Sequence, residues 1–270
     1  MTDKYAVIGN PIAHSKSPLI HRMFAEQTGQ DISYEAIEAP LDGFAATVER
    51  LRKEGYKGCN VTVPFKFEAF QSATELTERA RAAQAVNTLK FDGETILGDN
   101  TDGAGLVRDI EQNLGINLHG QHVLLMGAGG AAYGVVLPLL AAGAGLTVVN
   151  RTPEKSQQLG AAFATQGQIN VCSYAELGGK AFDCTINATS AGLTGSEIPL
   201  PETVFAPGAL AYDMMYGRET PFMKFAREHG AAIVSDGLGM LVEQAAEAFF
   251  LWRGVRPKTA PVISALRAMK

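Results

Sequence analysis

The sequence predicts an α/β protein with two consecutive domains and mainly parallel sheets. Its 270 residues fit one large domain or two of modest size. Hydrophobic residues make up 46% and charged residues 19%, which allows a sizeable core and excludes a disordered chain. Short apolar strand patterns alternate with helical patterns along most of the chain. This alternation is typical of parallel strands that are joined by helices.

The N-terminal hundred residues carry the first series of elements. Helical spacing of apolar residues predicts helices at residues 18–28, 44–53, 65–71 and 77–83. Gly29 and Gly55 follow the first two helices, where helices commonly end. Short apolar or alternating runs predict strands at residues 5–9, 32–37 and 60–63 and a hairpin at residues 86–91 and 95–97.

The rest of the chain predicts a second α/β series and two terminal helices. A helix is expected at residues 102–114, and βα units run from residue 122 to about residue 236. Helices at residues 240–253 and 261–268 are expected to return to the first domain. The expected boundaries are therefore residues 1–102, residues 103–237, and a returning segment at residues 238–270.

Between Gln112 and Asn150 the sequence has no Asp, Glu, Lys or Arg. So long an uncharged stretch resembles a membrane span. However, six glycines and Pro138 interrupt its central part, which divides into a strand, a turn, a helix and a second strand. We interpret the stretch as the buried core of the second domain.

The charge and the cysteines exclude several classes of function. The net charge of −5 and the lack of a basic stripe argue against a nucleic-acid partner. The first residues show no signal-peptide pattern. Cys59, Cys172 and Cys184 are odd in number and lack metal-ligand spacing, so we expect free thiols in a reducing cytoplasm and no metal site.

A glycine-rich turn follows the predicted strand at residues 123–126 and precedes a helical run. Gly127 would form the tight turn, and Gly129 would let the backbone approach a pyrophosphate at the positive end of the helix. A tight turn between packed elements is the alternative. In this strand-turn-helix context we favour a Rossmann-type dinucleotide site.

The next predicted strand ends in Asn150-Arg151-Thr152, with Lys155 close behind. NAD-binding domains usually place an acidic residue here to hold the ribose 2′-hydroxyl. A carboxylate would repel a 2′-phosphate, whereas a guanidinium can bind it through two hydrogen bonds. The sequence therefore favours NADP over NAD, although Arg151 could instead be a solvated loop residue.

Four polar segments lie where predicted strands end or helices begin, which is where open α/β sheets bind ligands. They are NPIAHSKSP (residues 10–18), NVTVPFK (60–66), GDNTDG (98–103, with Asn87 upstream) and GLGMLVEQ (237–244). Each also has an ordinary structural interpretation. Ser17 and Asp102 could cap helices, Thr62 could be a strand residue, and Lys66 could be solvated.

Together with GAGGAA, NRT, NATSAG (187–192) and DGLGML (236–241), these segments resemble the shikimate dehydrogenase family in order and spacing, from Tyr5 to about Pro261. The resemblance implies a cytoplasmic oxidoreductase of aromatic amino acid biosynthesis, a monomer or homodimer. It would reduce 3-dehydroshikimate to shikimate reversibly with NADPH. A paralogue acting on quinate, with NADP or NAD, is the alternative. A non-catalytic ligand-binding protein would require a broken Lys66–Asp102 pair, and both residues are present.

The resemblance also assigns site residues. It implies that Ser15 and Ser17 bind the substrate carboxylate and that Lys66 is the acid-base residue, paired with Asp102. Ring hydroxyls or other substrate groups would be held by Thr62, Asn87, Asp102, Tyr216 and Gln244. Cofactor contacts would fall at Gly127, Ala128, Gly129, Gly130, Ala131, Asn150, Arg151, Thr152, Lys155, Met214 and Gly237.

The residue types suit this chemistry. Reduction of a ring ketone needs a hydride and a proton for the developing alkoxide, and a lysine beside an aspartate can supply that proton. One position departs from the family pattern, because Tyr133 stands where the glycine turn commonly continues with a basic residue. We expect this departure to weaken cofactor affinity and to leave the fold unchanged.

Overall fold

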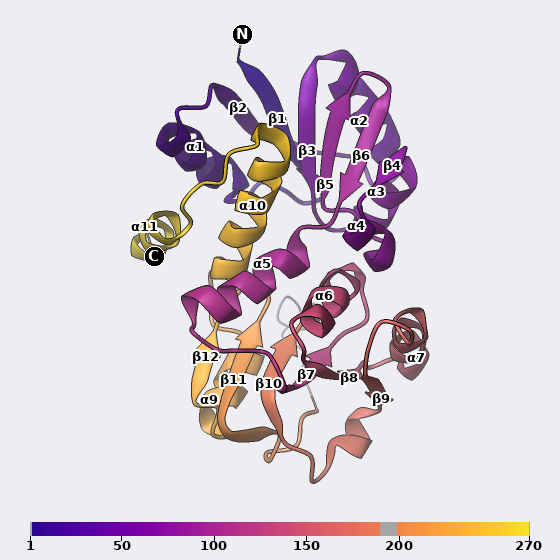
Figure 1. Cartoon of the computed structure of the whole chain (residues 1–270), viewed down its shortest axis with the longest axis vertical. Helices are drawn as coiled ribbons and strands as arrows, with labels where there is room; N and C mark the ends of the chain where they lie inside the picture. Colours follow the sequence, from indigo (N-terminus) through magenta and orange to yellow (C-terminus); the bar gives the residue numbers. More distant parts are fainter. Residues whose placement is uncertain (1, 190–198, 270) are drawn as a thin grey trace. The chain divides into compact units, whose positions relative to one another are not determined.

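The computed structural model describes residues 2–189 and 199–269, which form two compact units (Figure 1). The first unit contains the residues up to Gly105 together with those from Leu241 onward. The second unit is Leu106–Met240. Each unit is built around its own six-stranded sheet, and the predicted α/β class with mainly parallel sheets is confirmed.

The first unit has the strand order β2-β1-β3-β5-β6-β4. β1 is parallel to β2 and β3, and β4 is parallel to β6, whereas β5 is antiparallel to both of its neighbours. The predicted hairpin is therefore present as β5 and β6. The strands are β1 (Asp3–Gly9), β2 (Ile32–Glu38), β3 (Tyr56–Val61), β4 (Glu75–Leu76), β5 (Thr88–Asp92) and β6 (Thr95–Asp99).

The helices of this unit lie close to their predicted bounds. They are α1 (Ser17–Thr28), α2 (Phe44–Lys53), α3 (Lys66–Ser72), α4 (Glu78–Ala83), α10 (Leu238–Arg253), which enters the unit at Leu241, and α11 (Ala260–Ala268). α1 ends at Gly29, which has a φ of 65°. The strand predicted at residues 60–63 was misplaced, because the chain turns at Thr62, whose carbonyl accepts the Phe65 N–H at 3.0 Å.

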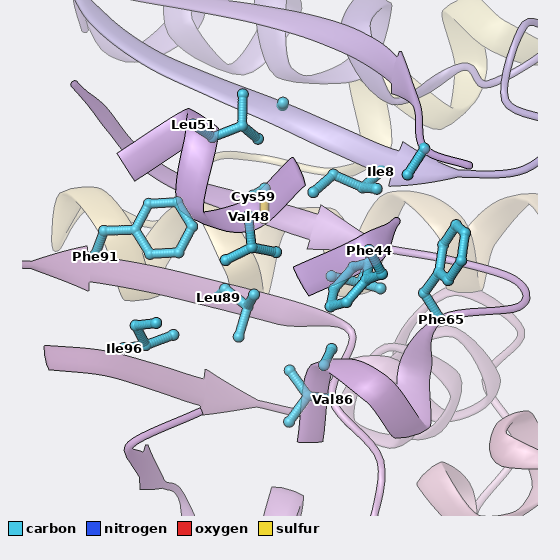
Figure 2. Packing of buried hydrophobic residues seen from close by; sticks show 14 of the residues in the cluster. Ile8, Phe44, Val48, Leu51, Cys59, Phe65, Val86, Leu89, Phe91 and Ile96 are labelled. Atoms are coloured by element: carbon cyan, nitrogen blue, oxygen red, sulfur yellow. The ribbon is translucent and has the colours of Figure 1, made fainter. Parts of the chain in front are cut away.

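One face of the first sheet is covered by α2 (Figure 2). Phe44, Val48 and Leu51 recur at helical spacing along α2 and are buried. They pack in one cluster with inward-facing strand residues, among them Ile8, Cys59, Leu89, Phe91 and Ile96. This core fixes the strands whose ends carry the candidate site.

The other face of the sheet carries an aromatic cluster that includes the C-terminal helix α10. Trp252 stacks on Tyr5 with ring centroids 4.6 Å apart. Its indole N–H donates to the carbonyl of Leu89 at 3.0 Å. A Cβ on Gly58 would lie 2.4 Å from that carbonyl oxygen and 2.6 Å from the indole nitrogen. The approach of α10 to the sheet therefore requires glycine at position 58.

The second unit contains six parallel strands in the order β12-β11-β10-β7-β8-β9. This is the Rossmann order, with the first strand of the unit in the middle of the sheet. The strands are β7 (His122–Met126), β8 (Gly145–Val149), β9 (Ile169–Cys172), β10 (Phe182–Asn187), β11 (Phe205–Asp213) and β12 (Ile233–Ser235). The helices with described bounds are α5 (Asp102–Arg108), which begins in the first unit, α6 (Gly130–Ala141), α7 (Pro153–Ala162) and α9 (Pro221–Glu228), with a 3₁₀ turn at Tyr174–Leu177.

The structure refines two predictions, one for the helix at residues 102–114 and one for the uncharged stretch. The helix expected at residues 102–114 is α-helical only to Arg108 and continues as a π-helical turn, Asp109–Asn113, in which the Leu114 N–H donates to the Asp109 carbonyl at 3.0 Å. The uncharged stretch forms β7, α6 and β8, whose strand residues are largely buried. Across the described residues, no helix is both long and apolar enough to span a membrane.

His21 of α1 is buried inside the aromatic cluster. Its ring stacks on Tyr34 at a centroid distance of 4.2 Å, and Phe249 and Trp252 lie near it. In the described part of the chain, neither ring nitrogen has a hydrogen-bond partner. Burial lowers the pKa of His21 to about 3. The folded protein therefore keeps this imidazole neutral at a pH where the unfolded chain would bind a proton.

We predict that this neutral imidazole makes the first unit sensitive to mild acid. The unfolded state takes up a proton near pH 6.5 and the folded state does not, so stability falls as the pH falls below that value. The loss is about 2 kcal/mol between pH 7 and pH 5 for this group alone. His21→Phe keeps an aromatic ring and should reduce the loss. Urea unfolding at pH 7 and at pH 5, followed by the fluorescence of Trp252, measures this loss of stability for the parent and the variant.

His119 is exposed and lies in the second unit, so His119→Phe is the matched control and should keep the acid sensitivity of the parent. If His21→Phe loses as much stability between the two pH values as the parent, the buried imidazole is not the cause.

Candidate functional site

The topology of the first sheet gathers the predicted substrate residues at one edge. β1, β3 and β6 end at this edge and β5 begins there, because β5 is antiparallel to its two neighbours. Asn60 pairs with Thr88, and Thr88 pairs with Asp99, which sets the three strand ends side by side. The segments that leave or enter the sheet here carry Ser15, Ser17, Thr62, Lys66, Asn87 and Asp102.

Lys66 and Asp102 form an ion pair at this edge. Lys66 Nζ lies 2.5 Å from Asp102 Oδ2, and the two side chains are 16% and 8% exposed. Asp102 is the first residue of α5, where a helix favours an anion. Lys66 is the first residue of α3, where a helix disfavours a cation. The lysine is therefore held by the carboxylate and not by the helix that carries it.

Asn87 fixes the second oxygen of the same carboxylate. The Thr101 N–H can only donate, and it lies 2.8 Å from Asn87 Oδ1, which identifies that atom as the amide oxygen. The amide nitrogen therefore faces Asp102 and donates to Oδ1 at 2.8 Å. Each carboxylate oxygen of Asp102 thus has its own donor, and the group is held in one orientation.

Gln244 reaches the cluster from α10. Its Oε1 lies 3.2 Å from Asn87 Nδ2, and its Nε2 donates to the Leu241 carbonyl at 2.8 Å. A Cβ on Gly105 would lie 2.7 Å from the Gln244 Cβ and from its backbone nitrogen. The close approach of α5 and α10 at this point therefore needs glycine at position 105.

The two serines and Thr62 lie at the same edge without joining this cluster. In the described part of the chain, no hydrogen bond connects Ser15, Ser17 or Thr62 to Lys66, Asn87, Asp102 or Gln244. Ser15 Oγ accepts from the Ser17 N–H at 3.3 Å. Ser17 is not a helix cap, because the cap position of α1 is Lys16 and no side chain caps this helix.

Tyr216 lies in a different part of the chain from the other predicted substrate residues. It follows β11 in the second unit, close in sequence to Met214. Its ring is partly buried. Within the second unit it is close in sequence to a predicted cofactor residue, and its predicted role in substrate binding stays a prediction.

In the second unit the carboxyl ends of four neighbouring strands are aligned. Val149 pairs with Met126, Met126 with Asn187, and Asn187 with Asp213. The predicted cofactor residues follow these ends and that of β12. They are Gly127 to Ala131 after β7, Asn150, Arg151, Thr152 and Lys155 after β8, Met214 after β11, and Gly237 after β12. In a doubly wound sheet this edge binds the ligand.

The glycine turn fits a dinucleotide. Gly127 has a φ of 112°, and a Cβ there would meet the Ala188 carbonyl oxygen at 3.0 Å, so the fold itself requires glycine. At Gly129 a Cβ would meet nothing within 4 Å, so packing does not explain the glycine. Gly129 is the cap residue of α6, and among the described residues no side chain caps this helix. The bare helix start can receive a phosphate.

Arg151 and Lys155 stand next to this turn as exposed cations. Among the described residues, no carboxylate lies within ion-pairing distance of either side chain. Asn150 shapes the loop by donating to the Thr152 carbonyl at 2.9 Å. Thr152 is the cap residue of α7, with a proline directly after it. These groups suit the 2′-phosphate of NADP.

Asp213 organises the loop that carries Met214, and the sequence analysis did not identify it. It is buried and accepts hydrogen bonds from Thr220 Oγ1 at 2.5 Å, the Met215 N–H at 3.0 Å and Asn187 Nδ2 at 3.1 Å. Burial raises the pKa of its carboxyl. Asp213 is the last residue of β11. A carboxylate that directly follows an apolar run was the signal in the sequence that could have identified it.

Met214 and Gly237 lie close together. A Cβ on Gly237 would stand 2.3 Å from the Met214 carbonyl oxygen, and the Gly237 N–H donates to the Met215 carbonyl at 2.8 Å. The end of the NATSAG motif, residues 190–192, lies outside the described residues.

Tyr133 is partly buried on α6, and its ring lies 5.9 Å from that of Phe163, measured between centroids. The structure thus gives this side chain a packing contact at the end of α7, while its effect on cofactor affinity stays a prediction. Within the described ranges, no cluster of three His, Cys, Asp or Glu side chains could hold a metal ion.

Family models match most of the chain in three segments. A model of the shikimate dehydrogenase substrate binding domain matches residues 7–89. A model described as shikimate / quinate 5-dehydrogenase matches residues 108–194, and one of the shikimate 5′-dehydrogenase C-terminal domain matches residues 237–267.

Individual relatives agree over nearly the full length. Shikimate dehydrogenase (NADP(+)) of Nitrosospira multiformis is 61% identical, with 99% of this chain and 98% of the relative covered. The structure of an Ael1 enzyme from Pseudomonas putida is 50% identical, covers 98% of both chains and gives a TM-score of 0.92. Shikimate 5-dehydrogenase from Thermus thermophilus, solved with NADP(H) and shikimate, is 32% identical, covers 99% of both chains and gives a TM-score of 0.88.

Proposed function

Since this chain belongs to the shikimate dehydrogenase family, we propose that Lys66 and Asp102 are the acid-base pair of its reaction. The chain is an NADP-dependent shikimate dehydrogenase, an oxidoreductase of the pathway to chorismate and the aromatic amino acids. It reduces 3-dehydroshikimate to shikimate, and the reaction is reversible. The 2.5 Å contact between Lys66 Nζ and Asp102 Oδ2 is the observation that carries the assignment.

The residues of the cluster account for the proton in this reaction. When bound, NADPH supplies the hydride that adds to the ketone carbon. Lys66 donates a proton from Nζ to the carbonyl oxygen, which becomes the hydroxyl of shikimate. Asp102 holds the ammonium group in place and, through Asn87, is itself held still. In the reverse direction Lys66 takes the proton back from that hydroxyl.

The remaining polar groups at this edge suit a polyhydroxylated carboxylic acid. We infer that Ser15 and Ser17 bind the carboxylate and that Thr62, Asn87, Asp102 and Gln244 bind ring hydroxyls. Amides and hydroxyls both donate and accept, as such hydroxyls require. Support comes from the shared edge of the sheet on which all of these residues but Gln244 lie, and from the hydrogen bond that joins Gln244 to Asn87. Tyr216 is proposed as a further substrate contact.

We infer that the second unit binds NADP through the turn at Gly127 to Ala131 and through Asn150 to Lys155, Met214 and Gly237. The open space at Gly129 and the exposed guanidinium of Arg151 support this assignment. All three cysteines are free thiols, which supports a reducing compartment such as the cytoplasm. A monomer or a homodimer is compatible with the family.

We predict that the purified protein oxidises NADPH in the presence of 3-dehydroshikimate. The four pairs of shikimate or quinate with NADP or NAD should show the highest kcat/KM for shikimate with NADP, measured by absorbance of the reduced cofactor. Highest activity on quinate would make the chain a quinate-using paralogue. A folded protein with no turnover on any pair would contradict the enzymatic function.

Lys66→Met should lower kcat by about 10²–10⁴-fold, because the reaction loses its proton donor. The melting temperature should stay close to that of the parent. Lys57→Met is the matched control, since Lys57 is exposed near the start of β3, at the opposite end of the strand from Thr62, and its kcat should not change. A large fall in melting temperature with an unchanged kcat would instead make Lys66 a structural residue.

Arg151→Ala should weaken NADP binding by about 10–100-fold, because charge-assisted hydrogen bonds contribute about 1.5–3 kcal/mol. Calorimetric titration of the free protein with NADP and with NAD measures this without turnover, and NAD affinity should change little. Arg227→Ala, at an exposed position of α9 in the same unit, is the control. Equal weakening for both cofactors would contradict the 2′-phosphate role.

A further inference from the structure

Asp99 is a buried carboxylate three residues before Asp102, and the reaction proposed above gives it no role. It lies at the end of β6 and is 1% exposed. Arg79 of α4 binds it with two atoms, Nε to Oδ1 at 2.7 Å and Nη2 to Oδ2 at 2.6 Å. Thr77 Oγ1 and the Asn100 N–H also donate to Oδ1, at 2.6 Å and 2.8 Å. The geometry is that of a bidentate ion pair.

Arg79 also reaches the helix that carries Gln244. Its Nη1 donates to Glu247 Oε1 at 3.2 Å. Glu247 follows Gln244 by three residues on α10, so both side chains lie on the same face of that helix. The planar guanidinium therefore joins the end of β6 to α10 with three nitrogen atoms in a fixed arrangement.

Asp99, which is held in this way, and the next residue, Asn100, position Asp102 and Asn87. Asn100 Nδ2 donates to the Ala85 carbonyl at 2.9 Å, and Asn100 Oδ1 accepts the Asp102 N–H at 3.2 Å. The Asn87 N–H donates to the Asp99 carbonyl at 3.0 Å. A displacement of Asp99 would therefore move the backbones of both residues that hold the carboxylate opposite Lys66.

Stability alone does not explain an ion pair in which the carboxylate is buried and the arginine is 29% exposed. Burial of the Asp99 carboxylate has a cost in free energy, and apolar residues of similar volume are often as stable as a buried ion pair. A bidentate pair also fixes the relative orientation of the two side chains, because both carboxylate oxygens and both nitrogens must be aligned.

We propose that Arg79, through Asp99 and Glu247, is a positioning residue for shikimate, which sets the places of Asp102, Asn87 and Gln244. This inference rests on the proposed roles of those three residues in substrate binding and proton transfer. Arg79 does not contact the substrate in this account. It acts by holding two segments that do.

Arg79→Gln should lower kcat/KM for shikimate by about 10–100-fold, since small misplacements of catalytic groups have effects of this size. KM for NADP should stay within about twofold of the parent, because the proposed cofactor residues all lie in the second unit. Arg79→Lys keeps the charge without the bidentate geometry and should lose less than Arg79→Gln. Steady-state kinetics at a temperature well below each melting midpoint measures these values.

Arg52→Gln is the matched control. Arg52 is a partly buried arginine of the same unit that pairs with Glu49 and donates to the Gly93 carbonyl, at the turn of the β5–β6 hairpin away from the site. It should lower stability without changing KM for shikimate. If Arg79→Gln and Arg79→Lys lower only the melting temperature, or raise both KM values equally, the positioning role is wrong. A parent that does not turn over shikimate with NADP would refute the proposed function as well, whereas an active parent with fully active variants refutes this inference alone.

Discussion

The alignment of strand ends is the constraint on which both candidate sites depend. Parallel strands bring their carboxyl ends to one edge of a sheet, so side chains far apart in the sequence become neighbours there. In the first unit the antiparallel β5 adds a strand start to the same edge, and this start is where Asn87 lies. In the second unit the register from Val149 to Asp213 places the glycine turn and the loop of Met214 at the same edge of the sheet, with the end of β10 between them.

Asp102, Asn87 and Lys66 at the first edge satisfy one another's hydrogen-bonding groups within the protein. Asp102 has a donor on each oxygen, and Asn87 is oriented by a backbone N–H that can only donate. In a partly buried site, unsatisfied polar groups would be costly, so such a network has few alternative arrangements. The cluster is therefore preorganised by hydrogen bonds that run back into the sheet.

The sequence predicted the fold class and most elements of the first unit, because those depend on local pattern, whereas the site residues that its short motifs indicate stay predictions. It could not predict features that depend on distant partners. The chain turns at Thr62, which places the end of β3 at Val61. The helix after Asp102 changes to a π-helical turn at Asp109. The Arg79–Asp99 pair joins residues that no local pattern relates, and Asp213 is explained only by its three donors.

Two of the glycines in the nucleotide turn, Gly127 and Gly129, are needed for different reasons. Gly127 is needed by the backbone itself, since its φ is 112° and Ala188 stands against it. Gly129 has ordinary dihedral angles and open space around it, so the folded chain would accept a methyl group there. A laboratory selection for folded protein alone would therefore let position 129 drift toward alanine or serine while it kept position 127. Selection for catalysis would hold both, so the difference between two such libraries would separate residues that build the fold from residues that serve the cofactor.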